Sequence, residues 1–177
     1  MNLSISTAEE IAVARTFLFE KGRACYRELP WRGDASPWAI LVSEIMLQQT
    51  QVPRVVAVYP RWIERFPRPS ALARLSVAEV LAAWSGLGYN RRALSLHKTA
   101  KILAEEYDDT VPASEEALRK LPGIGVYTAR AVLAFAFNIP SVFLETNIRT
   151  VFIRHFFSGE EPVGDGELEN IGAALLD

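Results

Sequence analysis

A Pro-Gly-x-Gly turn between two apolar helical segments restricts the fold of this chain more than any other feature. The turn, Pro122–Gly125, follows the apolar residues Leu118 and Leu121 and precedes an apolar segment that extends to about Asn138. Two glycines two positions apart allow the main chain to turn sharply and to approach a neighbour closely. The first N–H groups of the second helix can then face an anion. The pattern predicts either a grip on a nucleic-acid phosphate that reads no base, or an ordinary connection between helices.

The rest of the chain predicts an all-α fold. Apolar residues recur at helical spacing, and cap signals such as Ser36-Pro37 precede several of the segments. We find no convincing pairs of strands and no internal repeat. Helices are expected at about residues 7–26, 36–49, 53–65, 70–75, 76–85, 89–107, 114–121, 126–138 and 146–157, with the start of a further helix near the end of the sequence.

Composition limits the size of the core and the kind of contact that the chain can make with nucleic acid. The 177 residues, half of them apolar, suffice for the core of one domain or of two small ones. The formal net charge of −2 provides no broad basic surface, so contacts with nucleic acid must depend on local patches. The candidates are Arg54, Arg61, Arg65 and Arg68, and Arg91, Arg92, Lys98 and Lys101, although most such charges are solvated helix faces.

The single cysteine, Cys25, excludes an internal disulfide and any all-cysteine metal or iron–sulfur site within this chain. No apolar run is long enough to cross a membrane. We therefore expect a cytoplasmic protein with no membrane partner.

Glu44 and Gln48 occupy positions i and i+4 of a strongly apolar helical segment, next to Ile45, Met46 and Leu47. A carboxyl group beside that much apolar surface is expected to have a raised pKa and to hold a proton near neutral pH. The alternative is a surface glutamate on the solvated face of the helix.

A second carboxyl group, Glu145, follows the apolar run Val142–Leu144 at the expected start of a helix. The helix dipole favours an ionised carboxylate there. The alternative is a simple helix-terminal charge, with Thr146 and Asn147 as other candidate cap residues. One protonated and one ionised carboxyl group suit N-glycosidic cleavage, by analogy with sugar hydrolases, because the acid protonates the leaving base and the anion stabilises the oxocarbenium-like sugar. The sequence alone does not bring the two groups together in space.

Four motifs carry a resemblance to a known family. They are Leu29-Pro30-Trp31-Arg32, Ser43-Glu44-x-Met46-Leu47-Gln48-Gln49-Thr50-Gln51-Val52, Trp84-x-Gly86-Leu87-Gly88-Tyr89 and Leu121-Pro122-Gly123-Ile124-Gly125. In order and spacing they resemble the MutY adenine DNA glycosylases, which belong to the helix–hairpin–helix base-excision repair superfamily. The resemblance runs from about Thr7 to the end of the sequence. The Met-Leu-Gln-Gln-Thr-Gln and Gly-Leu-Gly-Tyr runs are more specific than the hairpin, which the whole superfamily shares.

The resemblance implies an enzyme that flips adenine mispaired with 8-oxoguanine out of the duplex into a pocket. Glu44 matches the family's catalytic glutamate, which protonates adenine at N7. Tyr89 matches a residue whose ring fills the gap left by the flipped nucleotide, with an aromatic residue of the core as the alternative. Gly123 and Gly125 match the phosphate-gripping hairpin, where related proteins often bind a monovalent cation through main-chain carbonyls. The remaining matches are Arg27, Leu29, Trp31 and Arg32 beside the adenine pocket, and Gln48, Gln49, Thr50 and Leu87 around the opposite base.

Tyr127 stands where bifunctional relatives such as endonuclease III carry a lysine that forms a Schiff base. A phenol cannot form that imine, so the resemblance implies a monofunctional glycosylase. Lys120 is near in sequence, but a lysine at a helix end is more often a solvated charge. The catalytic positions implied by the resemblance are therefore Glu44, Glu145, Tyr127 and Asn147.

Two features depart from the family's pattern. Glu145-Thr146-Asn147 replaces an Asp-Gly-Asn run, which retains the carboxylate but moves it one methylene outward. A misplacement of about 1 Å can lower a rate roughly a hundredfold. The family's four-cysteine iron–sulfur loop and its 8-oxoguanine-recognition domain have no counterpart in this sequence, so we expect no cofactor here. We expect either a fragment or a branch without the cluster, and the apolar run at 171–176 favours a fragment.

The sequence therefore predicts a two-lobed helical DNA glycosylase. Residues 28–139 form a six-helix barrel with the hairpin, and residues 1–27 and 140–177 form a second lobe, incomplete at its C-terminus, with Glu145 in the cleft. The expected partner is double-stranded DNA with a mispaired or damaged base, bound by a monomer. The alternatives are a glycosylase that removes thymine from T·G mismatches and a non-catalytic module that binds lesions or DNA.

Overall fold

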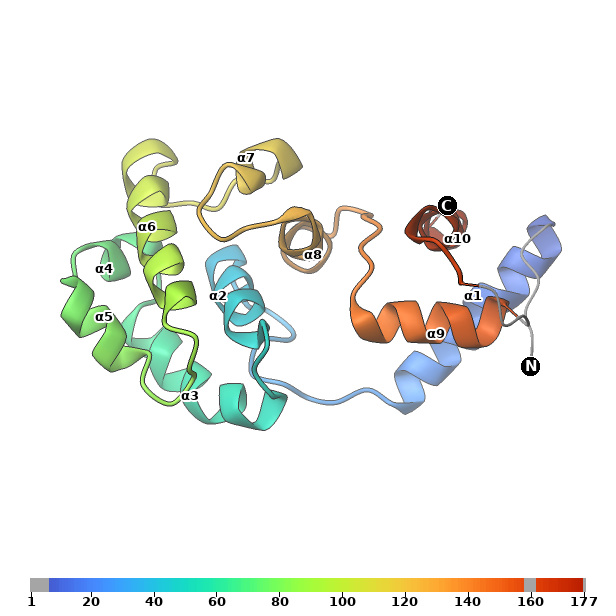
Figure 1. The fold of residues 1–177 in the computed structure, drawn as a ribbon, viewed down its shortest axis with the longest axis horizontal. Coiled ribbons are helices and arrows are strands. Elements are labelled where there is room, and N and C mark those ends of the chain that lie inside the picture. Colours follow the sequence, from blue (N-terminus) through green and yellow to red (C-terminus); the bar gives the residue numbers. More distant parts are fainter. Residues whose placement is uncertain (1–6, 158–161, 177) are drawn as a thin grey trace. The chain divides into compact units, whose positions relative to one another are not determined.

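The computed structural model describes residues 7–157 and 162–176, and all regular secondary structure among them is helical (Figure 1). This confirms the predicted all-α class. Residues 1–6, 158–161 and 177, which the predicted second lobe includes, lie outside the described residues. The helices are α1 (Ala8–Ala24), α2 (Pro37–Leu47), α3 (Val52–Arg65), α4 (Pro69–Ala73), α5 (Val77–Ala83), α6 (Arg91–Glu106), α7 (Glu115–Arg119), α8 (Val126–Phe137), α9 (Thr146–Phe156) and α10 (Asp165–Leu176).

The chain divides into two compact units. Glu28–Ile139 form the central unit, and Met1–Arg27 together with Pro140–Asp177 form the terminal unit. The central unit contains seven helices, α2 to α8, which is one more than the expected six-helix barrel. Two of them, α4 and α7, have only five residues each.

Helix α2 is the core helix of the central unit. Ser36 caps it by accepting a hydrogen bond from the Ala39 N–H at 3.2 Å, and Pro37 fits its first turn. Residues 38–46 are all buried, and α2 packs against α3, α6 and α8 (Figure 1). Full burial of an aliphatic side chain such as Leu41 stabilises the fold by about 1.5–3 kcal/mol. The helix ends at Leu47, before the expected residue 49, because Gln49 adopts the left-handed region at φ +55°.

Helix α6 connects most of the central unit, because it packs against α2, α4 and α5 (Figure 1). It begins at Arg91, two residues later than expected from the sequence. The cause is Tyr89, which precedes the helix with φ +50°. Its buried residues include Leu96, Ala100 and Leu103, at the spacing of one helix face.

Asp109 fixes the loop after α6 to the start of α4. Its carboxylate accepts hydrogen bonds from the Ser70 N–H at 2.5 Å and from the Ser70 hydroxyl at 2.8 Å. Arg68 Nε lies 3.7 Å from the same carboxylate. Because Ser70 lies in the first turn of α4, Asp109 caps this short helix from a distant part of the sequence.

Asp109→Ala should lower the free energy of unfolding by about 1–2 kcal/mol, because it removes the cap of α4. Asp108→Ala is a matched control, since Asp108 and Asp109 have φ values of +50° and +61° and alanine is strained equally at both. Urea unfolding of the two variants measures the difference. Equal losses would contradict the capping role of Asp109.

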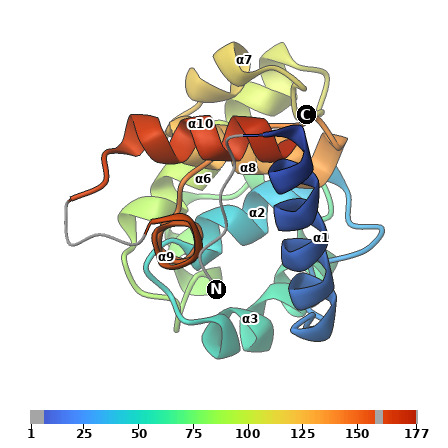
Figure 2. The same ribbon diagram turned by 90° about the vertical axis from the view of Figure 1, so that its right-hand side faces the viewer.

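The terminal unit contains α1, α9 and α10. Thr7 and Glu10 form a capping box at the start of α1, with hydrogen bonds of 3.2 and 2.9 Å. Helix α10 packs against both α1 and α9 (Figure 2). The Arg15 guanidinium donates to the carbonyls of Ala174 and Leu175 at 2.9 and 3.0 Å, and so satisfies carbonyls at the end of α10. Within the described residues no helix is both long and apolar enough to cross a membrane.

Candidate nucleic-acid interface and active site

The predicted hairpin lies between α7 and α8. Gly123 has φ +81°, and a Cβ there would lie 2.8 Å from Cβ of Ser95 on α6. Thr99, one turn further along α6, donates its hydroxyl to the Pro122 carbonyl at 3.0 Å. Gly125 is the N-cap of α8 and offers no side-chain acceptor to the first N–H groups of that helix. The turn is therefore braced by α6 from one side, while the start of α8 presents main-chain donors.

Gly123→Ala should destabilise the protein by about 1–3 kcal/mol, because alanine is strained at positive φ and its Cβ would clash with Ser95. Gly125→Ala is the control. Gly125 has φ −89°, and an added Cβ meets no atom within 4 Å. We expect the control to cost less than about 1 kcal/mol. Equal midpoints of urea unfolding for the two variants would contradict the tight packing of Gly123 against α6.

Glu44 is a buried carboxyl group, only 9% exposed, in the apolar helix α2. The alternative of a surface glutamate is therefore wrong. Gln48 follows one turn later as the C-cap of α2, and its side-chain amide donates to the hydroxyl of the buried Thr128 on α8 at 3.2 Å. Tyr127 precedes Thr128 and is 37% exposed. The meeting of α2 with α8 thus brings Gln48 together with the start of the helix that follows the hairpin.

Two loops beside this junction of α2, the first at residues 48–51 and the second at residues 86–89, expose polar and aromatic side chains. Gln49 is exposed and Thr50 half-buried in the first loop, while Tyr89 in the second is 62% exposed. The Thr50 hydroxyl donates to the Leu87 carbonyl at 3.3 Å, so the loops are in direct contact. The exposure of Tyr89 excludes the alternative of an aromatic residue packed in the core.

Leu87 is placed differently from the expectation of a residue at the opposite base. Its side chain is 1% exposed and belongs to the core of the central unit. The Trp84 indole N–H donates to the adjacent Gly88 carbonyl at 3.0 Å. The main chain changes direction between these two residues, since Gly88 and Tyr89 have φ values of +71° and +50°. Leu87 is buried and Tyr89 exposed, so Leu87 supports the loop instead of reaching out from it.

The loop at residues 29–32 also has an inner and an outer side. Trp31 is 7% exposed and packs edge-on against Tyr59, with ring centroids 5.4 Å apart. Tyr59 donates its hydroxyl to the Ala39 carbonyl at 3.0 Å, and burial raises the pKa of Tyr59 to about 12. Trp31 therefore anchors in the core the loop that the resemblance places beside the adenine pocket. Arg32 is exposed and Leu29 half-buried.

Glu145 is the N-cap of α9 and belongs to the terminal unit. One of its carboxylate oxygens accepts from the N–H groups of Asn147 and Ile148 at 3.0 and 3.1 Å. The other accepts from the Asn147 side-chain amide at 3.1 Å. The predicted position at a helix start is thus correct, and Asn147 holds the carboxylate from two directions. Arg27, the last residue of the first segment of the terminal unit, is exposed.

Arg92 is a residue that the sequence motifs present only as one of several basic side chains. In the structure its guanidinium contacts both of the exposed loops. The one available signal was its position, three residues after Tyr89 at the start of a helix.

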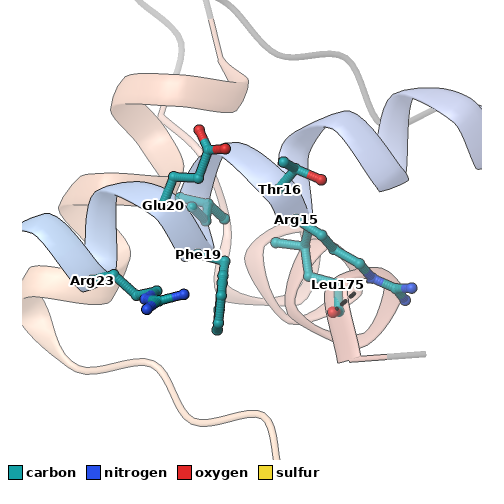
Figure 3. A pocket seen from close by; sticks show the side chains of 7 residues that line it. Arg15, Thr16, Phe19, Glu20, Arg23 and Leu175 are labelled. Atoms are coloured by element: carbon teal, nitrogen blue, oxygen red, sulfur yellow. Dashed lines mark hydrogen bonds between the residues drawn. The ribbon is translucent and has the colours of Figure 1, made fainter.

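A hollow of about 780 Å³ lies elsewhere, along α1 in the terminal unit (Figure 3). Figure 3 shows Arg15 beside it, reaching the carbonyl of Leu175. None of the predicted site residues lines this hollow. It is lined by Arg15, Thr16, Leu18, Phe19, Glu20, Arg23 and Leu175. Among the described residues, no group of three or more histidine, cysteine, aspartate or glutamate side chains could hold a metal ion.

Two bacterial relatives are close in sequence. The adenine DNA glycosylase of Mycolicibacterium smegmatis is 48% identical over 151 residues, which cover 84% of this chain and 52% of that protein. The adenine DNA glycosylase of Mycobacterium tuberculosis is 52% identical over 130 residues, which cover 73% of this chain and 43% of that protein. The chain thus spans about half the length of these curated relatives.

A thymine/uracil-DNA glycosylase of Pyrobaculum aerophilum is 36% identical over 154 residues and is covered to 67% of its length. Among solved structures, a thermostable thymine-DNA glycosylase matches 93% of this chain and 77% of its own, with a TM-score of 0.83 and 25% identity. A trapped covalent intermediate of endonuclease III with DNA matches 96% of this chain and 84% of its own, with a TM-score of 0.74. Its identity of 21% supports the fold alone.

The family described as HhH-GPD superfamily base excision DNA repair protein matches residues 42–171. This range contains the part of α2 from Val42 onward, with Glu44, as well as the hairpin and α9 with Glu145. The resemblance seen in the four motifs is confirmed by this match and by the identities above 45%. The chain belongs to the HhH-GPD superfamily of base excision DNA repair proteins.

Proposed function

We propose that this protein is a DNA glycosylase that hydrolyses the N-glycosidic bond of adenine mispaired with 8-oxoguanine or guanine. The observation that carries the proposal is Glu44, a carboxyl group 9% exposed within the strongly apolar helix α2. A buried carboxyl group needs a chemical or structural reason, because burial of a charge is costly. The relatives named adenine DNA glycosylase, at 48% and 52% identity, support adenine as the target.

In the proposed reaction Glu44 donates a proton to N7 of the flipped adenine. The bond between C1′ of the sugar and N9 then breaks, and its electron pair stays on the base. Water attacks the oxocarbenium-like sugar at C1′, and the Glu44 carboxylate accepts the proton that the water loses. Glu145 provides the negative charge that stabilises the sugar cation. Its two hydrogen bonds from α9 and a third from Asn147 hold the carboxylate in a fixed orientation for that role.

The proposed DNA contacts come from exposed groups of the central unit. The hairpin and the first N–H groups of α8 bind a phosphate. Tyr89, 62% exposed, enters the duplex where the base has left, while Gln49 and Thr50 contact the opposite base. Arg32 and Leu29 act beside the adenine, with Trp31 as the buried support of their loop, while Leu87 is the buried support of the loop that carries Tyr89.

We propose a monofunctional enzyme, without lyase chemistry. Tyr127 cannot form an imine with the sugar, and Lys120 is a poor substitute. The Lys120 ammonium lies 2.7 Å from Glu116 on the solvent-exposed side of α7. The hydrogen bond that Lys120 donates to Glu116, together with the negative charge of that carboxylate, raises the pKa of Lys120, so the neutral amine that imine formation needs is disfavoured.

Borohydride treatment during turnover should therefore trap no covalent complex of this protein with DNA. Endonuclease III, for which a trapped covalent intermediate with DNA is known, is the positive control. A denaturing gel separates crosslinked from free labelled DNA. A crosslinked band would contradict the monofunctional proposal, and a Lys120→Gln variant would then show whether Lys120 is the source.

A single assay tests the proposed substrate. Duplexes with A·8-oxoG, A·G and T·G pairs are incubated with the protein and then treated with hot alkali, which breaks the strand wherever a base has been released. We expect cleavage of the two adenine-containing duplexes only. Absence of cleavage in all three, at protein concentrations that bind the DNA, would refute the proposed activity.

Two observations favour an alternative substrate. The Pyrobaculum relative is named thymine/uracil-DNA glycosylase, and a thymine-DNA glycosylase has the same fold at a TM-score of 0.83. Cleavage at T·G would support that alternative. A third hypothesis is a non-catalytic DNA-binding module, because Glu145 stands in place of the family's aspartate. This hypothesis predicts that the protein binds the duplexes but cleaves none of them.

The remaining proposals concern partners and cofactors. We propose double-stranded DNA as the partner, bound by a monomer in the cytoplasm, and no cofactor held by this chain. Main-chain oxygens of the hairpin are suitable ligands for a monovalent cation, since a carbonyl that accepts one hydrogen bond, as Pro122 does, retains a second lone pair.

A further inference from the structure

The guanidinium group of Arg92 caps the C-terminal end of α2. Its Nη1 atom donates to the carbonyls of Ile45 at 3.0 Å, of Met46 at 2.8 Å and of Gln48. Carbonyls in the last turn of a helix have no partner within the helix, so a cation is favourable at this position. The side chain comes from the first turn of α6, 44 residues further along the chain than Gln48.

The other terminal nitrogen of Arg92, Nη2, contacts both loops. Nη2 donates to the Thr50 hydroxyl at 2.8 Å and to the carbonyls of Leu87 and Gly88 at 3.1 Å each. One planar group therefore joins the loop after α2 to the loop before α6. A fork of this geometry is specific to arginine, because lysine carries its three donors on a single nitrogen.

The partners of this guanidinium are oxygens and rings. Its central carbon lies 5.5 Å from the ring centroid of Trp84 and 5.4 Å from that of Tyr89. Burial lowers the pKa of Arg92, but an arginine stays charged in proteins. Because this half-buried guanidinium donates mainly to main-chain carbonyls, its chief effect is to fix the main chain, and it contributes little charge to the protein surface.

The two loops each contain one exposed residue in a strained conformation. Gln49 has φ +55° and Tyr89 has φ +50°, in the left-handed region that side chains other than glycine rarely adopt. Such conformations persist only where the surroundings determine them. Arg92 donates to the carbonyl that directly precedes each one, Gln48 before Gln49 and Gly88 before Tyr89. These hydrogen bonds fix the orientation of the two peptide planes and hence the directions in which both side chains project.

We propose that Arg92 is a positioning residue that holds Gln49 and Tyr89 in one rigid DNA-facing arrangement. The inference rests on the proposed function, in which these two side chains enter the duplex around a flipped base. Arg92 then acts on the flipping step through the loops, and the chemistry at the base stays with Glu44.

The first test measures the loops in the free protein. Arg92→Lys keeps the charge but cannot span both loops, so main-chain amides at residues 48–51 and 86–89 should exchange hydrogen about tenfold faster or more. Amides of the hairpin at 123–125 should be unchanged. Arg74→Lys is the matched control, because Arg74 is an exposed arginine of the same unit, and it should alter neither loop.

The second test separates positioning from general loss of structure. In single-turnover assays Arg92→Lys should release adenine from an A·8-oxoG duplex about a hundredfold more slowly than wild type. Adenine in a single-nucleotide bulge is already unpaired and costs less to extrude. The variant should therefore lose clearly less activity on the bulge, while a partly unfolded protein would lose activity on both substrates equally.

The outcomes are distinguishable. Equal losses on the two substrates, or unchanged exchange in both loops, would overturn the role of Arg92. Wild-type protein that releases no base from any DNA would refute the proposed function. In that case the exchange measurement still decides whether Arg92 fixes the two loops.

Discussion

Glu44→Gln should abolish base release while the protein stays folded and still binds DNA. Glutamine has almost the volume of glutamate and fits the same buried position on α2, but it has no proton to donate to adenine. Loss of a general acid lowers rates by about 10²- to 10⁴-fold, and we expect single-turnover release from an A·8-oxoG duplex to fall within this range. The dissociation constant for the duplex, measured by fluorescence anisotropy, should stay close to that of wild type.

Glu64→Gln is the matched control for this variant. Glu64 is an exposed glutamate on α3 in the same unit, so its replacement removes a carboxyl group without touching the core. It should release adenine at the wild-type rate. Full activity of Glu44→Gln would refute the assigned role of Glu44, and a large loss of DNA binding by that variant would indicate a structural effect.

The fold could be predicted from the sequence where the signals are local. Ser36-Pro37 marks the start of α2, and its side-chain cap forms as expected. The hairpin glycines predict a sharp turn, and Gly123 has the positive φ that only glycine adopts without strain. In each case a short stretch of chain contains the physical reason for its own conformation.

The site could not be predicted where its geometry depends on distant residues. Tyr89 resembles the start of a helix in sequence, yet it takes a left-handed conformation next to Arg92. Leu87 and Tyr89 are both apolar enough for a core, and only the three-dimensional packing decides that the first is buried and the second exposed. Gln49 also lies within a helical sequence pattern. In the structure it adopts a left-handed conformation directly after Gln48, whose carbonyl accepts a hydrogen bond from Arg92.

Glu145→Gln should also abolish base release, and Glu145→Asp should retain it. Glutamine keeps an acceptor for the first N–H groups of α9 but loses the negative charge that we assign to stabilisation of the sugar cation. Loss of one such electrostatic contact lowers rates by about 10²- to 10³-fold. The lost interaction with the helix dipole costs only about 0.3–1 kcal/mol of stability, so the variant should remain folded and bind the mismatch.

The aspartate variant makes the test specific to charge. Aspartate is a favoured N-cap, so α9 keeps an anionic cap after Glu145→Asp. If the carboxylate acts by its charge, the aspartate variant should remain clearly more active than the glutamine variant in single-turnover assays, although the shift by one methylene lowers its rate below wild type. If both variants are fully active, Glu145 is only the cap of α9, and the three hydrogen bonds that it accepts serve the helix alone.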